Sequence, residues 1–148
     1  ASLLQHLISH GIEYENRTID EDKGFKSSIT VDLVSAVGGN RLTQASVRGT
    51  IAEGNIMIAR LNDFNKLYFE PFGHHNLIFT YADRPGILGQ IGAPLAEHRI
   101  NIDDVRNPHD SNGVESLALL KVNQPVSDEV VDQIARCIKA DIAVYAYL

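Results

Sequence analysis

The fold of this chain is decided by residues 75–95, HNLIFTYADRPGILGQIGAPL. Residues 75–81 read as a strand in which Leu77, Phe79 and Tyr81 share one face, because side chains two positions apart in a strand point to the same side. After the turn at residues 83–86, apolar residues recur three or four positions apart, which is the period of a helix. The expected buried residues are Leu77, Phe79 and Tyr81 of the strand, and Ile87, Leu88, Ile91 and Leu95 of the helix.

The turn at residues 83–86 also supplies signals for the start of a helix. Asp83 offers a side-chain acceptor at the cap position, and Pro85 fits the first turn, where its missing N–H is tolerated. Glycines then follow at every third position, and this spacing differs from the G-x-G-x-x-G of dinucleotide-binding turns. These glycines, which would let a ligand or a second backbone approach closely, are Gly86, Gly89 and Gly92.

The rest of this half completes a recognisable order of elements. Residues 100–105 and 114–122 read as two strands around a polar loop, and Ser127 is a good cap for a second amphipathic helix. Residues 142–148 then alternate as a last strand. Strand, helix, strand, strand, helix, strand is the ferredoxin-like βαββαβ order, an antiparallel sheet with both helices on one face.

The first 73 residues predict a separate, small α+β domain with a mostly antiparallel sheet. Alternating apolar residues separated by glycine-rich turns support hairpins, and the Pro-Phe-Gly at residues 71–73 marks the boundary. We therefore expect one domain over residues 1–73 and another over residues 74–148. The expected elements of the first are a helix at 3–10, strands at 29–35, 45–51, 56–58 and 67–69, and turns at 38–40 and 53–55.

Composition excludes several functional classes. A formal net charge of −6 opposes broad electrostatic binding to nucleic acid or to an anionic membrane. The single cysteine, Cys137, cannot form an internal disulfide and favours a cytoplasmic location. No apolar run approaches the length of a membrane span, and the chain opens on Ala1 without an initiator Met, so we expect a fragment of a longer protein.

Residues 75–89, together with LAEHRINI at 95–102, closely resemble the signature of ACT domains. Residues 115–118 and 125–130 resemble the C-terminus of the D-3-phosphoglycerate dehydrogenase family, and residues 1–73 look like a partial allosteric substrate-binding domain of its longer members. The resemblance implies a regulatory fragment of serine biosynthesis that is not itself an enzyme, forms homo-oligomers through ACT domains and binds L-serine for feedback inhibition. It also implies that NAD, the cofactor, belongs to a catalytic part outside this chain.

In that family serine binds at the interface of two ACT domains, and the matching positions are Tyr81, Asp83 and Asn101. The geometry of the fold agrees, because the first and second strands run parallel and put Asp83 and Asn101 at opposite ends of a protomer, roughly 20 Å apart. One chain therefore cannot close the site, whereas edge pairing about a twofold axis brings Asn101 of the partner subunit to Asp83.

The chemistry of these residues fits a zwitterion. The Asp83 carboxylate suits an ammonium group, and the N–H groups at the start of the helix suit a carboxylate. Asn101 can donate and accept, and Tyr81 can orient the ligand. The expected effector-binding residues are Tyr81, Asp83, Gly86, Ile87, Leu88 and Asn101.

Simpler explanations exist for each of these residues. Asp83 is a good helix cap, Tyr81 a possible sheet-face aromatic and Asn101 a possible strand-start residue. His6 and His10 have a zinc-compatible spacing without a third ligand, so we expect no metal site. Basic residues of the first domain suit either an anion pocket, as the resemblance implies, or a solvated sheet face. These are Lys26, Arg41, Arg48, Arg60 and Lys66.

Arg99 departs from the family pattern, which usually has glycine after the first ACT helix. A left-handed residue at that point is easier for glycine, so the sequence leaves open how Arg99 affects the turn before Asn101. This departure keeps one alternative function open, an oligomerisation module with a vestigial site. A separate alternative is the ACT sensor of another enzyme such as an iron–sulfur L-serine dehydratase.

Overall fold

The computed structural model describes residues 5, 9, 13, 28–36 and 42–148. Its strands and helices are, in chain order, β1 (Ser28–Ala36), β2 (Leu42–Ala52), β3 (Asn55–Leu61), β4 (His75–Ala82), α2 (Ile87–Glu97), β5 (Ile102–Arg106), β6 (Glu115–Val122), α3 (Asp128–Ile138) and β7 (Ile142–Tyr147). Of the helix expected at residues 3–10, only residues 5 and 9 are described, and both are helical. The turn at 38–40, and His6, His10, Lys26 and Arg41, lie outside the described residues.

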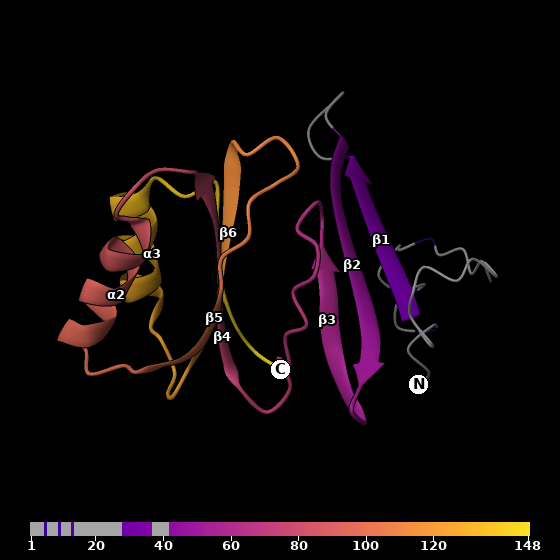
Figure 1. Cartoon of the computed structure of the whole chain (residues 1–148), viewed down its shortest axis with the longest axis horizontal. Coiled ribbons are helices and arrows are strands. Elements are labelled where there is room, and N and C mark those ends of the chain that lie inside the picture. The colour runs from indigo at the N-terminus through magenta and orange to yellow at the C-terminus, as the bar shows by residue number, and fades with distance from the viewer. Residues whose placement is uncertain (1–4, 6–8, 10–12, 14–27, 37–41) are drawn as a thin grey trace.

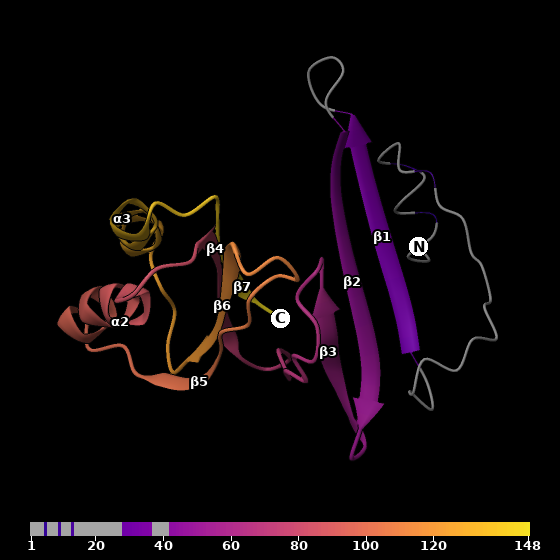
Figure 2. The ribbon, with the colours of Figure 1, turned by 45° about the horizontal axis from the view of Figure 1, so that its top comes forward.

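These elements form two antiparallel sheets. One has three strands in the order β1-β2-β3, and the other has four in the order β5-β6-β4-β7. Both helices cover one face of the four-stranded sheet, and the three-stranded sheet lies beyond the opposite face, with β3 nearest and β1 farthest (Figures 1 and 2). The fold is therefore α+β, and its second half has the ferredoxin-like order that the sequence predicts.

The main core lies between the helices and the four-stranded sheet. The predicted inward residues of β4, which are Leu77, Phe79 and Tyr81, are all at most 1% exposed. They pack against the apolar stripes of the two helices, where Ile91, Leu95, Ile134 and Ile138 are fully buried. Ser127 caps α3 as predicted, because its side chain accepts a hydrogen bond from the N–H of Val130.

A second, smaller cluster joins the outer face of the same sheet to the segment that follows β3. Phe64, Leu67 and Phe69 pack against Leu117 and Leu119 of β6. Main-chain hydrogen bonds also tie this segment to the edge of β3 through Ala59 and Ile58. The last strand predicted for the first domain, at residues 67–69, is thus an isolated bridge to β3.

The start of α2 differs from the sequence-based expectation. The helix begins at Ile87, and its cap residue is Gly86 in a left-handed conformation, with no side-chain hydrogen bond at the cap. Asp83 therefore does not cap the helix, and Pro85 lies before the cap instead of in the first turn. Leu88 was also expected in the buried stripe, but it is 44% exposed because the helix turns that position away from the sheet.

Two turns contain residues in the left-handed conformation. Glu53 and Gly54 both have positive φ, 51° and 80°, and make the two-residue hairpin turn between β2 and β3 that the sequence predicts. Gly73, with φ 76°, precedes β4, and its N–H donates to the carbonyl of Leu148. The domain boundary at residues 71–73 stays a prediction.

Candidate functional site

Asp83 stands in an open position between β4 and α2. Its N–H donates to the carbonyl of Val114 over 2.9 Å, which fixes its backbone against the loop before β6. Its side chain is 40% exposed. Arg84 secures the next residue, because its guanidinium donates to the carbonyls of Ala82 and Ile138. The Asp83 carboxylate is thus held on a fixed loop and still faces solvent.

The N-terminus of α2 lies three residues further on. The first N–H groups of a helix have no partner within the helix and carry the positive end of its dipole. Apart from the adjacent residues and the backbone of the helix itself, no described atom lies within 4 Å of where a Cβ would stand at Gly86, Gly89 or Gly92. The space at the start of this helix is therefore open to a ligand carboxylate or to another chain.

The loop between β5 and β6 folds back beside Asp83. The Nδ1 of His109 lies 2.7 Å from the Oγ of Ser116, and the same nitrogen lies 3.5 Å from the Oδ2 of Asp83. Ser116 is fully buried, whereas the His109 side chain is 54% exposed. Because one ring nitrogen contacts both groups, this is not the geometry of a catalytic triad, in which the two imidazole nitrogens take different partners.

Tyr81 lies in the core below Asp83 instead of facing solvent. It is 1% exposed, and its hydroxyl accepts a hydrogen bond from the Nδ2 of Asn107 over 2.6 Å. Burial raises the pKa of Tyr81 above its ordinary value of 10.0; the hydrogen bond from Asn107 opposes this shift, and the nearby Asp83 carboxylate adds to it. The ring of Tyr81 is therefore well described as an aromatic side chain buried on the inner face of the sheet.

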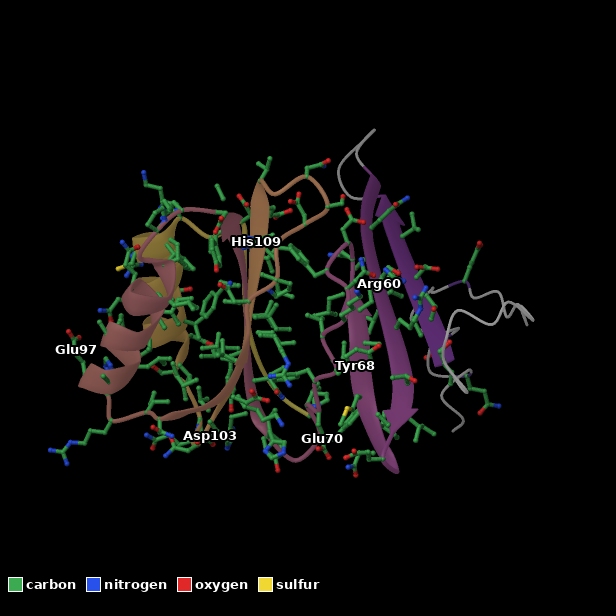
Figure 3. All side chains as sticks on the ribbon, viewed as in Figure 1. Arg60, Tyr68, Glu70, Glu97, Asp103 and His109 are labelled. Atoms are coloured by element: carbon green, nitrogen blue, oxygen red, sulfur yellow. The ribbon has the colours of Figure 1, made fainter. Side chains whose placement is uncertain are left out.

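Asn101 lies at the opposite end of the same sheet. The β4–β6 register pairs Ala82 with Glu115, and the β5–β6 register pairs Ile102 with Val122. The eight residues of β6 span about 25 Å, so one protomer cannot bring Asp83 and Asn101 together. Figure 3 shows this separation, because His109 is at one end of the sheet and Asp103 is at the other.

The turn before Asn101 keeps its left-handed residue. Arg99 has φ 57°, and its carbonyl accepts a hydrogen bond from the Nε2 of Gln124. The Asn101 N–H donates to Asn123, and its side-chain Nδ2 donates to the carboxylate of Asp103. Arg99 therefore adopts the left-handed conformation that is easier for glycine, and the arginine does not prevent a left-handed turn at this point.

The strand that carries Asn101 forms an edge of the sheet. Within the described part of the chain, β5 pairs with β6 alone. Two apolar side chains on this strand, Ile102 and Val105, are 36% and 39% exposed. An edge with unpaired main-chain groups and apolar side chains is a surface on which another strand can pair.

Other chemistry is sparse over residues 28–36 and 42–148. Within those ranges, no three His, Cys, Asp or Glu side chains gather closely enough to hold a metal ion. Cys137 is a free, exposed thiol. Arg60 is engaged with Ser46 and the carbonyl of Asn62. None of the helices over the described residues is long and apolar enough to cross a membrane.

Sequence reasoning missed the contribution of residues 107–113. It placed them in a polar loop between two strands, but nothing in their order shows that the loop turns back at Asp110 and pairs His109 with Ser116. The only available signal was the concentration of Asn, His, Asp and Ser between two apolar strands. Of the predicted residues, Asp83 lies on the short loop that leads to Gly86, Ile87 and Leu88 at the start of α2, whereas Asn101 lies at the other end of the sheet.

Comparison with known proteins now identifies the second half of the chain. The ACT domain family matches residues 75–139. Residues 75–139 are an ACT domain. Its order of strands and helices agrees with the ferredoxin-like sheet described above.

The chain resembles D-3-phosphoglycerate dehydrogenases over most of its length. It is 30% identical to the Mycobacterium tuberculosis enzyme over 131 residues, which is 88% of this chain and 24% of the relative. It is 27% identical to the Archaeoglobus fulgidus enzyme, covering 87% of this chain, and 26% identical to the Bacillus subtilis enzyme, covering 84%. The chain thus spans about a quarter of the length of these relatives, and its ACT domain is homologous to their C-terminal region.

One solved structure also overlaps in part. A formyltetrahydrofolate deformylase from Pseudomonas syringae pv. tomato aligns with a TM-score of 0.44 and 21% identity, covering 54% of this chain and 29% of that protein.

Proposed function

We propose that this chain is the regulatory part of a D-3-phosphoglycerate dehydrogenase, in which L-serine binds at an interface between two ACT domains and inhibits the enzyme. The position of Asp83 carries the proposal. Its carboxylate is partly exposed, caps no helix and stands just before the open N-terminus of α2. The simplest structural role for this aspartate, helix capping, is therefore absent, and a carboxylate on a rigid loop suits a ligand cation.

The two charges of an α-amino acid match this corner of the molecule. An ammonium group pairs with the Asp83 carboxylate, and the carboxylate on the same carbon meets the N–H groups of Ile87 and Leu88 at the positive end of the helix dipole. Gly86 leaves the approach open because a Cβ there would have no neighbour within 4 Å among the described residues.

A second protomer completes the site through the β5 edge. Antiparallel pairing of two β5 strands about a twofold axis covers Ile102 and Val105 and satisfies the free edge. The start of one strand then lies beside the end of the other. Asn101 of the partner subunit would lie beside the loop that carries Asn107 and His109, which is the loop next to Asp83.

Tyr81 takes a different role from the one that the resemblance implies. Its buried hydroxyl holds Asn107, and Asn107 also donates to the carbonyl of Leu117. We assign Tyr81 to the support of the loop beside Asp83, where removal of its hydroxyl weakens effector binding indirectly.

Inhibition would follow from preferential binding to one arrangement of the dimer. L-Serine can shift the enzyme only by its difference in affinity between two arrangements, and an interface site provides such a difference. The NAD-dependent catalytic part lies outside these 148 residues in this proposal, and the enzyme works in the cytoplasm.

Two alternatives remain distinct from this proposal. A pure oligomerisation module would dimerise through the same edge without binding serine. The left-handed conformation of Arg99 speaks against it, because the arginine allows the left-handed turn before Asn101 that glycine would make easily. The ACT sensor of an iron–sulfur L-serine dehydratase would also bind serine, but the similar proteins are D-3-phosphoglycerate dehydrogenases.

Calorimetric titration with L-serine tests the proposal. We expect stereospecific binding by the purified chain, no binding by Asp83→Ala, and weak or no binding of glycine and D-serine. Size-exclusion chromatography with light scattering should show that Asp83→Ala still dimerises. A folded wild-type dimer that binds no serine would contradict the proposal and leave the oligomerisation module.

A further inference from the structure

The imidazole beside Asp83 has no part in the family signature and no role in the fold core. His109 lies on the loop between β5 and β6, and its side chain is 54% exposed (Figure 3). It is nevertheless anchored, because its Nδ1 lies 2.7 Å from the Oγ of Ser116, a serine with no solvent exposure. A buried hydroxyl thus holds the ring with the same nitrogen 3.5 Å from the Asp83 carboxylate.

We infer that His109 is an additional residue of the effector site, which makes occupation of Asp83 by an amino-acid ammonium group dependent on pH. The inference rests on the proposed function, since it concerns the ammonium position of that same site. A cationic imidazole at this distance pairs with the Asp83 carboxylate and repels a second cation. A neutral imidazole leaves the full negative charge of Asp83 to the ligand.

The charged groups around the ring favour this role. Asp83 is the carboxylate that the imidazole faces, whereas the Asp110 carboxylate accepts hydrogen bonds from the N–H groups of Val114 and Glu115. The guanidinium of Arg84 donates to the carbonyl of Ala82 at the end of β4 and to that of Ile138 at the end of α3. The remaining titratable neighbours are Glu115, at the start of β6, and Tyr81, whose hydroxyl is bound by Asn107.

The direction of the effect follows from the charges. Histidine is the side chain that gains its charge as the pH falls from about 8 to about 5. Serine keeps its ammonium group throughout this range, so acidification adds a competing cation without changing the ligand cation. Because the Asp83 and His109 side chains are both partly exposed, we expect the modest effect of a solvent-exposed ion pair, about threefold to fivefold in affinity.

The test is a calorimetric titration of the full chain with L-serine at about pH 8 and about pH 6, in two buffers of different ionisation enthalpy. Wild type should bind about threefold to fivefold more weakly at the lower pH and release protons on binding, as linkage requires. His109→Gln should bind with similar affinity at both pH values and without proton release. The matched control, His74→Gln, changes an exposed histidine at the other end of β4 and should behave as wild type.

Each outcome separates this inference from the proposed function. Serine binding that is equally tight at both pH values in wild type, or pH dependence that persists in His109→Gln, overturns the role of His109 and leaves the effector site standing. If His109→Gln does not fold, His109→Asn replaces it in the same titrations, and pH dependence that persists in that variant overturns the role of His109. No serine binding at pH 8 contradicts the proposed function, and the role of His109 falls with it.

Discussion

Asp83 and Asn101 lie at opposite ends of one sheet, because Asp83 follows the strand residue paired with Glu115 and Asn101 precedes the one paired with Val122. Two residues that the resemblance assigns to one ligand therefore cannot meet within a protomer. The free edge of β5 supplies the way in which two chains would bring them together. The β5 edge would thus both form the dimer and complete the effector site.

Asp83→Ala should leave the free energy of unfolding nearly unchanged, because Asp83 does not cap α2 and its contact with His109 is partly exposed. Ser127→Ala is the contrasting variant, since Ser127 caps α3, and it should lower that free energy by about 1 kcal/mol. Urea unfolding measures both. A large loss in Asp83→Ala would show that the aspartate has a structural role.

Arg99→Gly should stabilise the chain by about 1 kcal/mol, because glycine adopts the left-handed conformation of this position without steric strain. Lys139→Gly should act in the same direction, since Lys139 is the left-handed cap of α3. Arg136→Gly, inside the last turn of that helix, should instead destabilise by about 1 kcal/mol. Thermal unfolding distinguishes the three, and a destabilised Arg99→Gly would contradict the strain argument.

Tyr81→Phe should change the alkaline stability of the fold. Folding raises the pKa of Tyr81 above 10.0, so the folded chain retains a proton that the unfolded chain loses. The corresponding stability is present below pH 10 and is lost as the pH rises through the folded pKa. The variant should lack this alkaline loss of stability. At neutral pH its free energy of unfolding should be lower by about 1 kcal/mol, because Asn107 loses a hydrogen-bond partner.

Exposed Tyr147 supplies the control for that experiment. In urea unfolding, the free energy of unfolding of Tyr147→Phe should fall between neutral and alkaline pH as much as that of the wild type. If the free energy of Tyr81→Phe falls equally, groups other than Tyr81 cause the alkaline loss.

Phe69→Ala should lower the free energy of unfolding by about 3 to 5 kcal/mol, the usual effect of emptying a phenylalanine site in a core. Phe69 is fully buried in the cluster that joins the segment after β3 to the four-stranded sheet. Phe72→Ala removes the same side chain from a position that is 52% exposed, so its effect should stay within about 0.5 kcal/mol. Similar losses for the two variants would show that the second cluster contributes little.

Much of the second half could be predicted because its periodicities are long and agree with one another. The inner face of β4, the stripe of α3 and the cap at Ser127 are local signals, and the structure follows all three. The start of α2 could not be predicted, because Asp83 and Gly86 are both acceptable caps in a sequence. The structure uses the left-handed Gly86, and Asp83 is left available.

The candidate site was only partly predictable for a similar reason. Asp83 and Asn101 follow from the family signature, but His109 and Asn107 reach Asp83 and Tyr81 only because the loop folds back on β6. Such a reversal depends on contacts distant in sequence and leaves no periodic trace. For Tyr81 the sequence pattern was right about position, because it placed the residue on the inner face of the sheet. The same burial keeps its ring from reaching a surface ligand.

The central claim, that the effector site is shared between two chains, is tested most directly with a mixed dimer of Asp83→Ala and Asn101→Ala. Each variant alone has no intact site, whereas a purified heterodimer carrying two different tags recovers one, formed by Asp83 of one chain and Asn101 of the other. Calorimetry should therefore detect no serine binding by either homodimer and one serine per heterodimer. A heterodimer that binds no serine, although the wild-type dimer does, would contradict a shared site.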